Sequence, residues 1–196
     1  MKHQENKTLE KIIKVARDLF VENGFNGTSI RDIAKKAKVQ TSLIYHYFSN
    51  KTDLWKTSKE SLISPETFKS INNCMQSETF EGFLRELVVA RFNIHINNPE
   101  MLRMLDWQRL EKNMSLIGVR SQQNIVSFDH LEKRIAHFQE IGQVVKEYSP
   151  KYILLFITSA VFAPFIRSYD YDKAIIKEGD FIETTIRVLL KSFKEV

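Results

Sequence analysis

The segment 28–51, TSIRDIAKKAKVQTSLIYHYFSNK, constrains the fold of this chain more than any other. Its first part carries apolar residues at positions i, i+3, i+4 and i+7, namely Ile30, Ile33, Ala34 and Ala37. This spacing predicts a short helix with a single buried face. Thr28 precedes the helix, and we expect its hydroxyl to cap the first turn.

A second short helix is predicted over Gln40–Tyr47, directly after a tight turn. Val39 and Ile44 are expected to point to the core. The outward face then consists of small hydrogen-bonding residues and aromatics without any acid: Gln40, Thr41, Ser42, Tyr45 and His46. Two short helices with such an outward face are typical of a helix-turn-helix, whose second helix enters the major groove of DNA.

From residue 8 to 54 the chain resembles the N-terminal domain of the TetR (tetracycline-repressor-like) family of bacterial regulators. The resemblance is carried by the order of four motifs: Gly24-Phe25, the run from Thr28 to Ala34, the aromatic run Tyr45-His46-Tyr47-Phe48, and Lys51 with Leu54. It implies an all-α protein with a three-helix DNA-binding domain at residues 1–54. A larger helical domain at 55–196 would then bind an effector and form dimers.

Three positions depart from the family pattern. Lys38 occupies a turn position where glycine is common, and a positive φ there would cost a lysine about 1 kcal/mol. Ser42 and Leu43 stand where the family often has Gly-Thr, so Leu43 lacks the hydroxyl that the family offers to DNA. We expect these departures to change the DNA contacts more than the fold.

The predicted DNA contacts fall into two groups. Gln40, at the helix N-terminus, can pair with adenine, and the other residues expected to face the groove are Thr41, Ser42, Tyr45 and His46. Phosphate contacts, which fix register without reading sequence, are expected from four residues: Thr28, Lys38, Tyr47 and Lys51. Phe48 is expected to pack the small domain instead.

The excess of positive over negative charge lies in the same part of the chain. Residues 1–56 carry 11 Lys and Arg against 6 Asp and Glu, whereas residues 57–196 carry 18 of each. The excess positive charge therefore coincides with the predicted DNA-binding domain, as a phosphate-binding module requires. The single cysteine, Cys74, excludes an intrachain disulfide and favours a cytoplasmic location, and the apolar run 152–166 is too short for a membrane span.

The remainder of the chain also shows helical patterns. Helices are expected over 9–22, from about 51, and over 79–97, 100–112, 128–147, 150–166 and 181–193, with less regular chain over 113–127 and a polar connection over 170–179. The sequence contains no catalytic, cofactor-binding or metal-binding motif of the common kinds, so an enzyme is not expected.

The last three of these helices are candidates for self-association, because the helix over 150–166 is apolar nearly all round. The alternative is an ordinary monomer core. The helices in the middle of the chain, over 79–97 and 100–112, could enclose an unidentified small-molecule effector. The candidate residues for this site are Arg91, His95, Met104 and Trp107. A Met-rich core without a ligand is the alternative for these residues.

Together these features predict a ligand-responsive, homodimeric DNA-binding transcriptional regulator. The resemblance favours a repressor that binds a palindromic operator. A regulator that responds to a partner protein, or to no signal, is the nearest alternative. A helical interaction module whose basic face meets acidic protein or anionic lipid is an alternative of another class.

Overall fold

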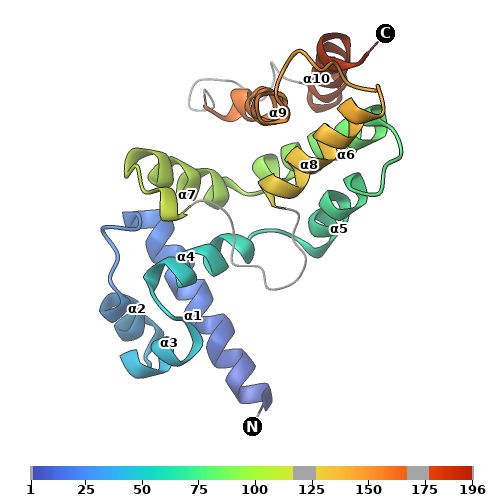
Figure 1. Ribbon diagram of the computed structural model, residues 1–196. Coiled ribbons are helices and arrows are strands. Elements are labelled where there is room, and N and C mark those ends of the chain that lie inside the picture. Colours follow the sequence, from blue (N-terminus) through green and yellow to red (C-terminus); the bar gives the residue numbers. More distant parts are fainter. Residues whose placement is uncertain (1, 117–126, 167–176, 196) are drawn as a thin grey trace. The chain divides into compact units, whose positions relative to one another are not determined.

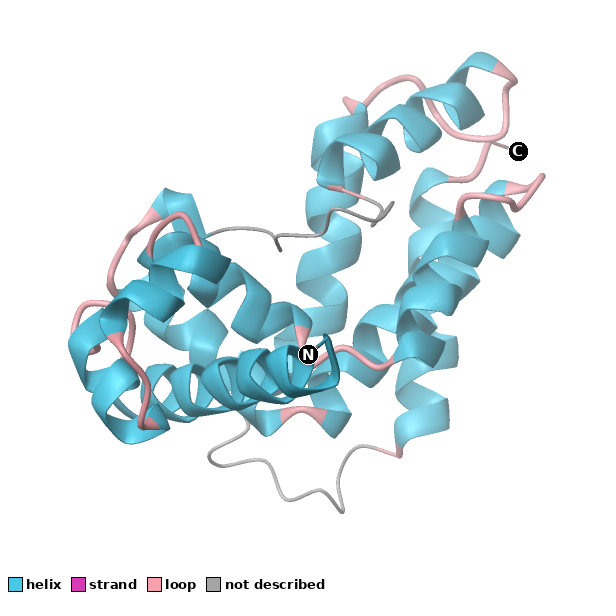
Figure 2. Cartoon of the chain, turned by 90° about the horizontal axis from the view of Figure 1, so that it is seen from below, coloured by secondary structure: helices cyan, strands magenta, loops and turns pink. Residues whose placement is uncertain are grey.

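The computed structural model describes residues 2–116, 127–166 and 177–195, which form ten α-helices, one short 3-10 helix and no strand (Figures 1 and 2). The predicted all-α fold is confirmed. These residues contain no helix that is long and apolar enough to cross a membrane. The chain forms two compact units, which we call the N-terminal unit (1–63 and 98–123) and the C-terminal unit (64–97 and 124–196).

The N-terminal unit contains five α-helices and the 3-10 helix η1: α1 (Lys2–Asn23), α2 (Ile30–Ala37), α3 (Thr41–Tyr47), α4 (Lys51–Glu60), α7 (Pro99–Leu110) and η1 (Met114–Leu116). Helix α1 packs against α2, α4 and α7. This compact unit reaches beyond residue 54 and includes a helix from the middle of the chain. The functional boundary after residue 54 stays a prediction.

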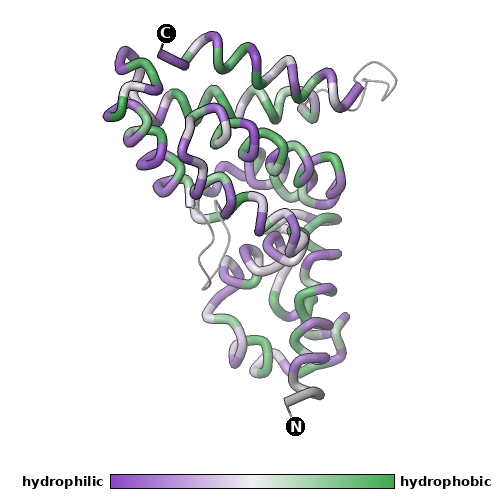
Figure 3. The backbone as a smooth tube through the Cα atoms, turned by 90° about the vertical axis from the view of Figure 1, so that its right-hand side faces the viewer, coloured by the Kyte–Doolittle hydropathy of each residue, from purple (hydrophilic) through white to green (hydrophobic). Residues whose placement is uncertain are grey.

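The C-terminal unit contains the other five helices: α5 (Pro65–Cys74), α6 (Phe80–Asn97), α8 (Phe128–Glu140), α9 (Pro150–Ile166) and α10 (Glu178–Phe193). Helix α6 packs against α5, α9 and α10, and α9 also contacts α8 and α10. Green and purple stretches alternate along much of the chain in Figure 3. Helices α5, α8 and α10 are amphipathic, whereas α9 is apolar nearly all round.

The observed helices follow the predicted ones with a few differences. Helix α1 begins seven residues before the predicted start at Leu9, and α5 was not predicted at all. Helix α8 ends at Glu140, seven residues before the predicted end, and Gly142 with φ of 73° turns the chain after it. Most of the irregular stretch 113–127 and of the connection 170–179 lies outside the described residues.

The core of the N-terminal unit forms where α1, α2, α3 and α4 meet. Trp55 of α4 is fully buried, with ring centroids 5.0 Å from Phe20 and 5.7 Å from Phe25. All four apolar residues predicted to form the buried face of α2 are buried, and Ile44 of α3 is too. These contacts, rather than helix propensity, hold the short helices α2 and α3 in place.

Ser29, not Thr28, caps helix α2. The Ser29 hydroxyl accepts from the Asp32 backbone N–H at 3.1 Å, and the Asp32 carboxylate accepts from the Ser29 backbone N–H at 3.1 Å. This capping box contributes about 1 kcal/mol. The hydrogen bonds from Ser29 lower the pKa of Asp32. The prediction for Thr28 was wrong because its buried hydroxyl donates instead to carbonyls of the preceding chain, Gly24 at 2.8 Å and Leu19 at 3.1 Å.

The turn between α2 and α3 is closed by a left-handed residue. Lys38 has φ of 56° and ψ of 48°, and its backbone N–H donates to carbonyls of the last turn of α2. The Val39 N–H donates to Ala34 O at 3.0 Å, which completes the helix end. Lys38 therefore carries the conformational cost of about 1 kcal/mol that glycine avoids.

Aromatic and aliphatic side chains fill the core of the C-terminal unit. The Phe138 ring centroid lies 5.9 Å from Phe80 and 5.5 Å from Phe83, so α8 packs on the start of α6. The α8–α9 connection is fixed by Gln139, whose buried amide donates to Val145 O at 2.7 Å and to Tyr148 O at 2.8 Å.

Lys59 is a buried cation in the N-terminal unit. Its ammonium donates to Leu116 O at 2.6 Å and to Gln108 Oε1 at 3.0 Å, and these bonds join α4 to η1 and α7. Burial, helped by the charge of Lys56, lowers the pKa of Lys59 from 10.5 to about 8. The folded protein therefore releases this proton at lower pH than the unfolded chain does.

This pKa difference predicts a pH-dependent contribution to stability. Between pH 8 and 10.5 the unfolded chain holds more protons at residue 59, so the free energy of unfolding should rise with pH in this window. Relative to Lys59→Met, we expect the wild-type protein to gain on the order of 2–3 kcal/mol from about pH 7.5 to about pH 10. Urea unfolding of both proteins at several pH values measures this gain, and parallel stability curves would contradict it.

Candidate nucleic-acid interface

Helix α3 presents a polar face to solvent. Gln40, Ser42, Tyr45 and His46 are exposed, and the Tyr45 side chain is 55% exposed. Gln40 lies just before the helix in an extended conformation, and its side chain makes no capping hydrogen bond. The amide of Gln40 is thus available at the helix N-terminus, where helices of this type approach base edges.

Three other residues in or directly after α3 are less exposed to solvent. Tyr47 is half-buried against the N-terminal core, with its ring 5.1 Å from His46 and 6.5 Å from Phe48. Phe48 is buried, and its predicted role in packing is confirmed. Thr41 is half-buried at the start of the helix. A base or phosphate contact by Tyr47 or Thr41 stays a prediction.

Lysines line the approach to α3. Lys35, Lys36 and Lys38 are all exposed at or just after the end of α2. No acidic residue occurs between Asp32 and Asp53, so the sequence that forms the turn and α3 carries only positive formal charge. Such a surface attracts the phosphate backbone without regard to sequence.

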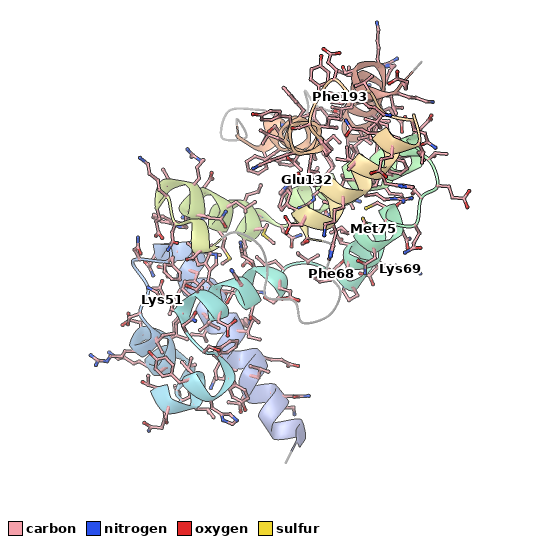
Figure 4. All side chains as sticks on the ribbon, in the orientation of Figure 1. Lys51, Phe68, Lys69, Met75, Glu132 and Phe193 are labelled. Carbon is pink, nitrogen blue, oxygen red and sulfur yellow. The ribbon has the colours of Figure 1, made fainter. Side chains whose placement is uncertain are left out.

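Lys51, at the first residue of α4, is partly engaged inside the protein (Figure 4). Its ammonium donates to Phe25 O at 2.8 Å and to Thr28 O at 3.0 Å, and it lies 4.1 Å from the centroid of the Phe25 ring. Burial lowers the pKa of Lys51, and the nearby Glu111 carboxylate partly offsets this. Two hydrogens of the ammonium hold the α1–α2 connection, which leaves one for a phosphate.

The buried Thr28 hydroxyl is occupied by the carbonyls of Gly24 and Leu19, so it is not available for the predicted phosphate contact. This hydroxyl has a single hydrogen to donate. Thr28 therefore acts on the interface indirectly, by fixing the chain that leads into α2.

Helix α7 supports the connection between α1 and α2, and no local sequence pattern predicts this role. The Trp107 indole donates to Val21 O at 3.2 Å, and Glu111, just after α7, accepts from the Asn26 backbone N–H at 3.0 Å. Arg17 of α1 also pairs with Glu100 at 3.2 Å. These contacts join segments that are far apart in the chain, and the two hydrogen bonds span 86 and 85 residues.

The four residues predicted to bind an effector do not belong to the same unit. Met104 is fully buried in the core of the N-terminal unit, and Trp107 packs against that core. Arg91 and His95 lie on α6 in the C-terminal unit. Met104 and Trp107 therefore help to pack the N-terminal unit. An effector contact by any of the four residues stays a prediction.

Two family models match the chain in succession. The model of bacterial regulatory proteins of the tetR family matches residues 12–56, which span most of α1, the helix-turn-helix and the start of α4. The model of the tetracyclin repressor-like C-terminal domain matches residues 84–174. The chain belongs to the TetR family. The predicted resemblance is thereby confirmed over both halves of the chain.

Individual relatives agree with this assignment. The chain is 27% identical over 122 residues to the transcriptional repressor NicS of Pseudomonas putida, a match that covers 62% of the chain and 56% of NicS. It is 30% identical over 118 residues to the Tn10 TetC protein of Escherichia coli, covering 56% of the chain and 59% of TetC. The chain thus matches less than two thirds of the length of either relative.

The fold is shared with solved structures of transcriptional regulators. The regulator FadR from Bacillus subtilis, in complex with stearoyl-CoA, superposes with a TM-score of 0.65 at 17% identity, covering 93% of this chain and 97% of that one. At this identity the likeness shows the fold alone. A DNA-binding transcriptional regulator is the function that the family and the relatives support, and they do not favour a helical interaction module.

Proposed function

We propose that this protein is a homodimeric, effector-responsive transcriptional repressor that binds a palindromic operator through α3. The observation that carries the proposal is the exposed face of α3, with Gln40, Ser42, Tyr45 and His46 beside the lysines of α2. This surface combines groups that read bases with charges that bind phosphates. An operator lies on DNA inside the bacterial cell, so the protein would act in the cytoplasm.

Helices α9 and α10 support the proposed dimer. Tyr152, Leu155 and Phe156 of α9 are 60%, 58% and 59% exposed, and Val188 of α10 is 56% exposed. The α9 residues follow helical spacing on one face, and no charged residue occurs from 152 to 166. An uncharged apolar face of this kind is typical of a protein–protein interface. A two-fold dimer would present two α3 helices to two half-sites.

Repression would be relieved when an effector favours a conformation with lower operator affinity. The effector must bind the two conformations with different affinity, because equal affinity shifts no equilibrium. The candidate residues on the described chain are Arg91 and His95 of α6.

Two substitutions separate base reading from phosphate binding. Gln40→Ala should relax the preference at one position of each half-site, at a cost of about 1–3 kcal/mol for the preferred base. Lys38→Gly should instead weaken binding to all sequences and lower the salt slope by about one, while it relieves the left-handed strain at residue 38. Fluorescence anisotropy on operator variants at two salt concentrations measures both effects. If Gln40→Ala weakens all sequences equally, Gln40 does not read a base.

A further inference from the structure

Helix α6 carries two polar side chains into an aromatic environment in the C-terminal unit. Arg91 and His95 are one turn apart and therefore lie on the same face of the helix. The Arg91 guanidinium carbon is 5.0 Å from the centroid of the Phe128 ring. The His95 ring lies 5.0 Å from Phe162 and 5.4 Å from Phe165. The rings come from the first residue of α8 and from α9, which packs against α6.

Both side chains have enclosed polar atoms without a hydrogen-bond partner. Among the described residues, nothing accepts from Arg91 Nε or bonds to His95 Nδ1. Two other arginines do pair with carboxylates, Arg85 with Glu183 and Arg17 with Glu100. An enclosed Nε–H without an acceptor is costly, and an acceptor supplied by a ligand would remove that cost.

The described residues supply no carboxylate that pairs with Arg91. Within the described part of the chain, the group whose charge would favour the Arg91 cation is the Cys74 thiol. Burial raises the pKa of this thiol to about 12, so the thiol is neutral at pH 7. Burial, and then the charge of Arg91, lower the pKa of His95 to about 4. The pair thus offers one positive charge together with a neutral imidazole that can donate or accept a hydrogen bond.

We propose that Arg91 and His95 recognise the charged end of the effector, and that the effector is a small monocarboxylate with an aromatic or aliphatic body. The planar guanidinium can hold a carboxylate through two parallel hydrogen bonds, and His95 can complete the contact. One negative charge balances the single cation, whereas a phosphate dianion would leave a charge uncompensated. The rings of Phe92, Phe162, Phe165 and Phe181 provide apolar surroundings for the body of the ligand.

Calorimetric titration of the full-length protein with matched compounds tests this assignment. We expect phenylacetate and octanoate to bind, and phenylacetamide and octanamide to bind roughly 10- to 100-fold more weakly, because the amides carry no charge. Arg91→Met should weaken binding of the acids by a similar factor and leave the amides unchanged. Arg85→Gln, on the exposed face of the same helix, should bind the acids as the wild type does. Phenyl phosphate should bind more weakly than phenylacetate.

Three results would overturn the assignment: no saturable binding of either acid at millimolar concentration, equal binding of acids and amides, or tighter binding of phenyl phosphate. The unfolding temperature of the unliganded protein shows whether the variant still folds. Arg91→Met should unfold at a higher temperature than the wild type, since a partly buried cation with an unpaired Nε is replaced by an apolar side chain. A lower unfolding temperature would mean that Arg91 serves the fold.

The effector role of this ligand rests on the proposed function, but the binding test does not. Calorimetry needs no DNA, so a protein that bound the acids but no operator would contradict the proposed regulator and leave the anion site intact. A protein that bound an operator but neither acid would contradict the anion site alone.

Discussion

Leu155→Glu combined with Phe156→Glu is expected to convert the protein to a monomer and to weaken operator binding by about 100-fold or more. Both side chains are more than half exposed on α9, so the substitutions should leave the fold intact. In a dimer they would place four carboxylates in an apolar interface, at an energetic cost that breaks the association. A monomer engages a single half-site and loses the gain of roughly 10²–10⁴ that linked binding provides.

Sedimentation velocity at micromolar concentration and anisotropy on a palindromic operator measure the two parts of this prediction. Ile141→Glu is a matched control, because Ile141 is an exposed apolar residue of the same unit outside α9 and α10. It should leave both the mass and the operator affinity unchanged. A doubly substituted protein that remains a dimer would place the interface elsewhere.

Gly24→Ala is expected to destabilise the N-terminal unit by about 2–4 kcal/mol. Gly24 has φ of +74°, and a Cβ there would lie 2.8 Å from two carbons of the Trp107 ring and 2.6 Å from Glu111 Oε1. The Trp107 ring cannot easily move away, because its indole N–H donates a hydrogen bond to Val21 O. The substitution therefore combines backbone strain with a steric clash, and the unfolding temperature of this unit should fall by roughly 10 °C or more.

Gly142→Ala separates the two causes. Gly142 has φ of +73°, but a Cβ added there would have no atom of the described chain within 4 Å, so only the backbone strain of about 1 kcal/mol should remain. Thermal unfolding of both variants, with hydrogen exchange to assign each transition to a unit, makes the comparison. An equal loss of stability in the two variants would show that the contact with Trp107 and Glu111 does not require glycine.

Local patterns predicted the local structure well. The spacing of Ile30, Ile33, Ala34 and Ala37 identified the buried face of α2, and the apolar character of Val39 and Ile44 placed α3 on the core. Where local predictions failed, a competing local signal was present. The spacing from Ser29 to Asp32 is that of a capping box, and Ser64-Pro65 is a good start for α5.

Long-range packing could not be predicted from such patterns. The Met- and Leu-rich character of α7 indicated an apolar environment, but nothing in it specified the N-terminal unit as the partner of Met104 and Trp107. The same limit applies to Arg91, whose Nε lacks an acceptor among the described residues, because this is visible only once the side chains of α8 and α9 are placed. Candidate DNA contacts were easier to predict, because they lie within one short segment whose layout follows from its own sequence.

Operator recognition by a dimer is best tested by selection from a random double-stranded DNA library at near-physiological salt. We expect recovery of a palindrome whose half-sites are separated by about one helical turn or a multiple of it, as a two-fold dimer requires. Recovery of no motif, with only salt-sensitive binding to all sequences, would contradict the proposed regulator, because the surface around α3 would then bind charge without reading bases.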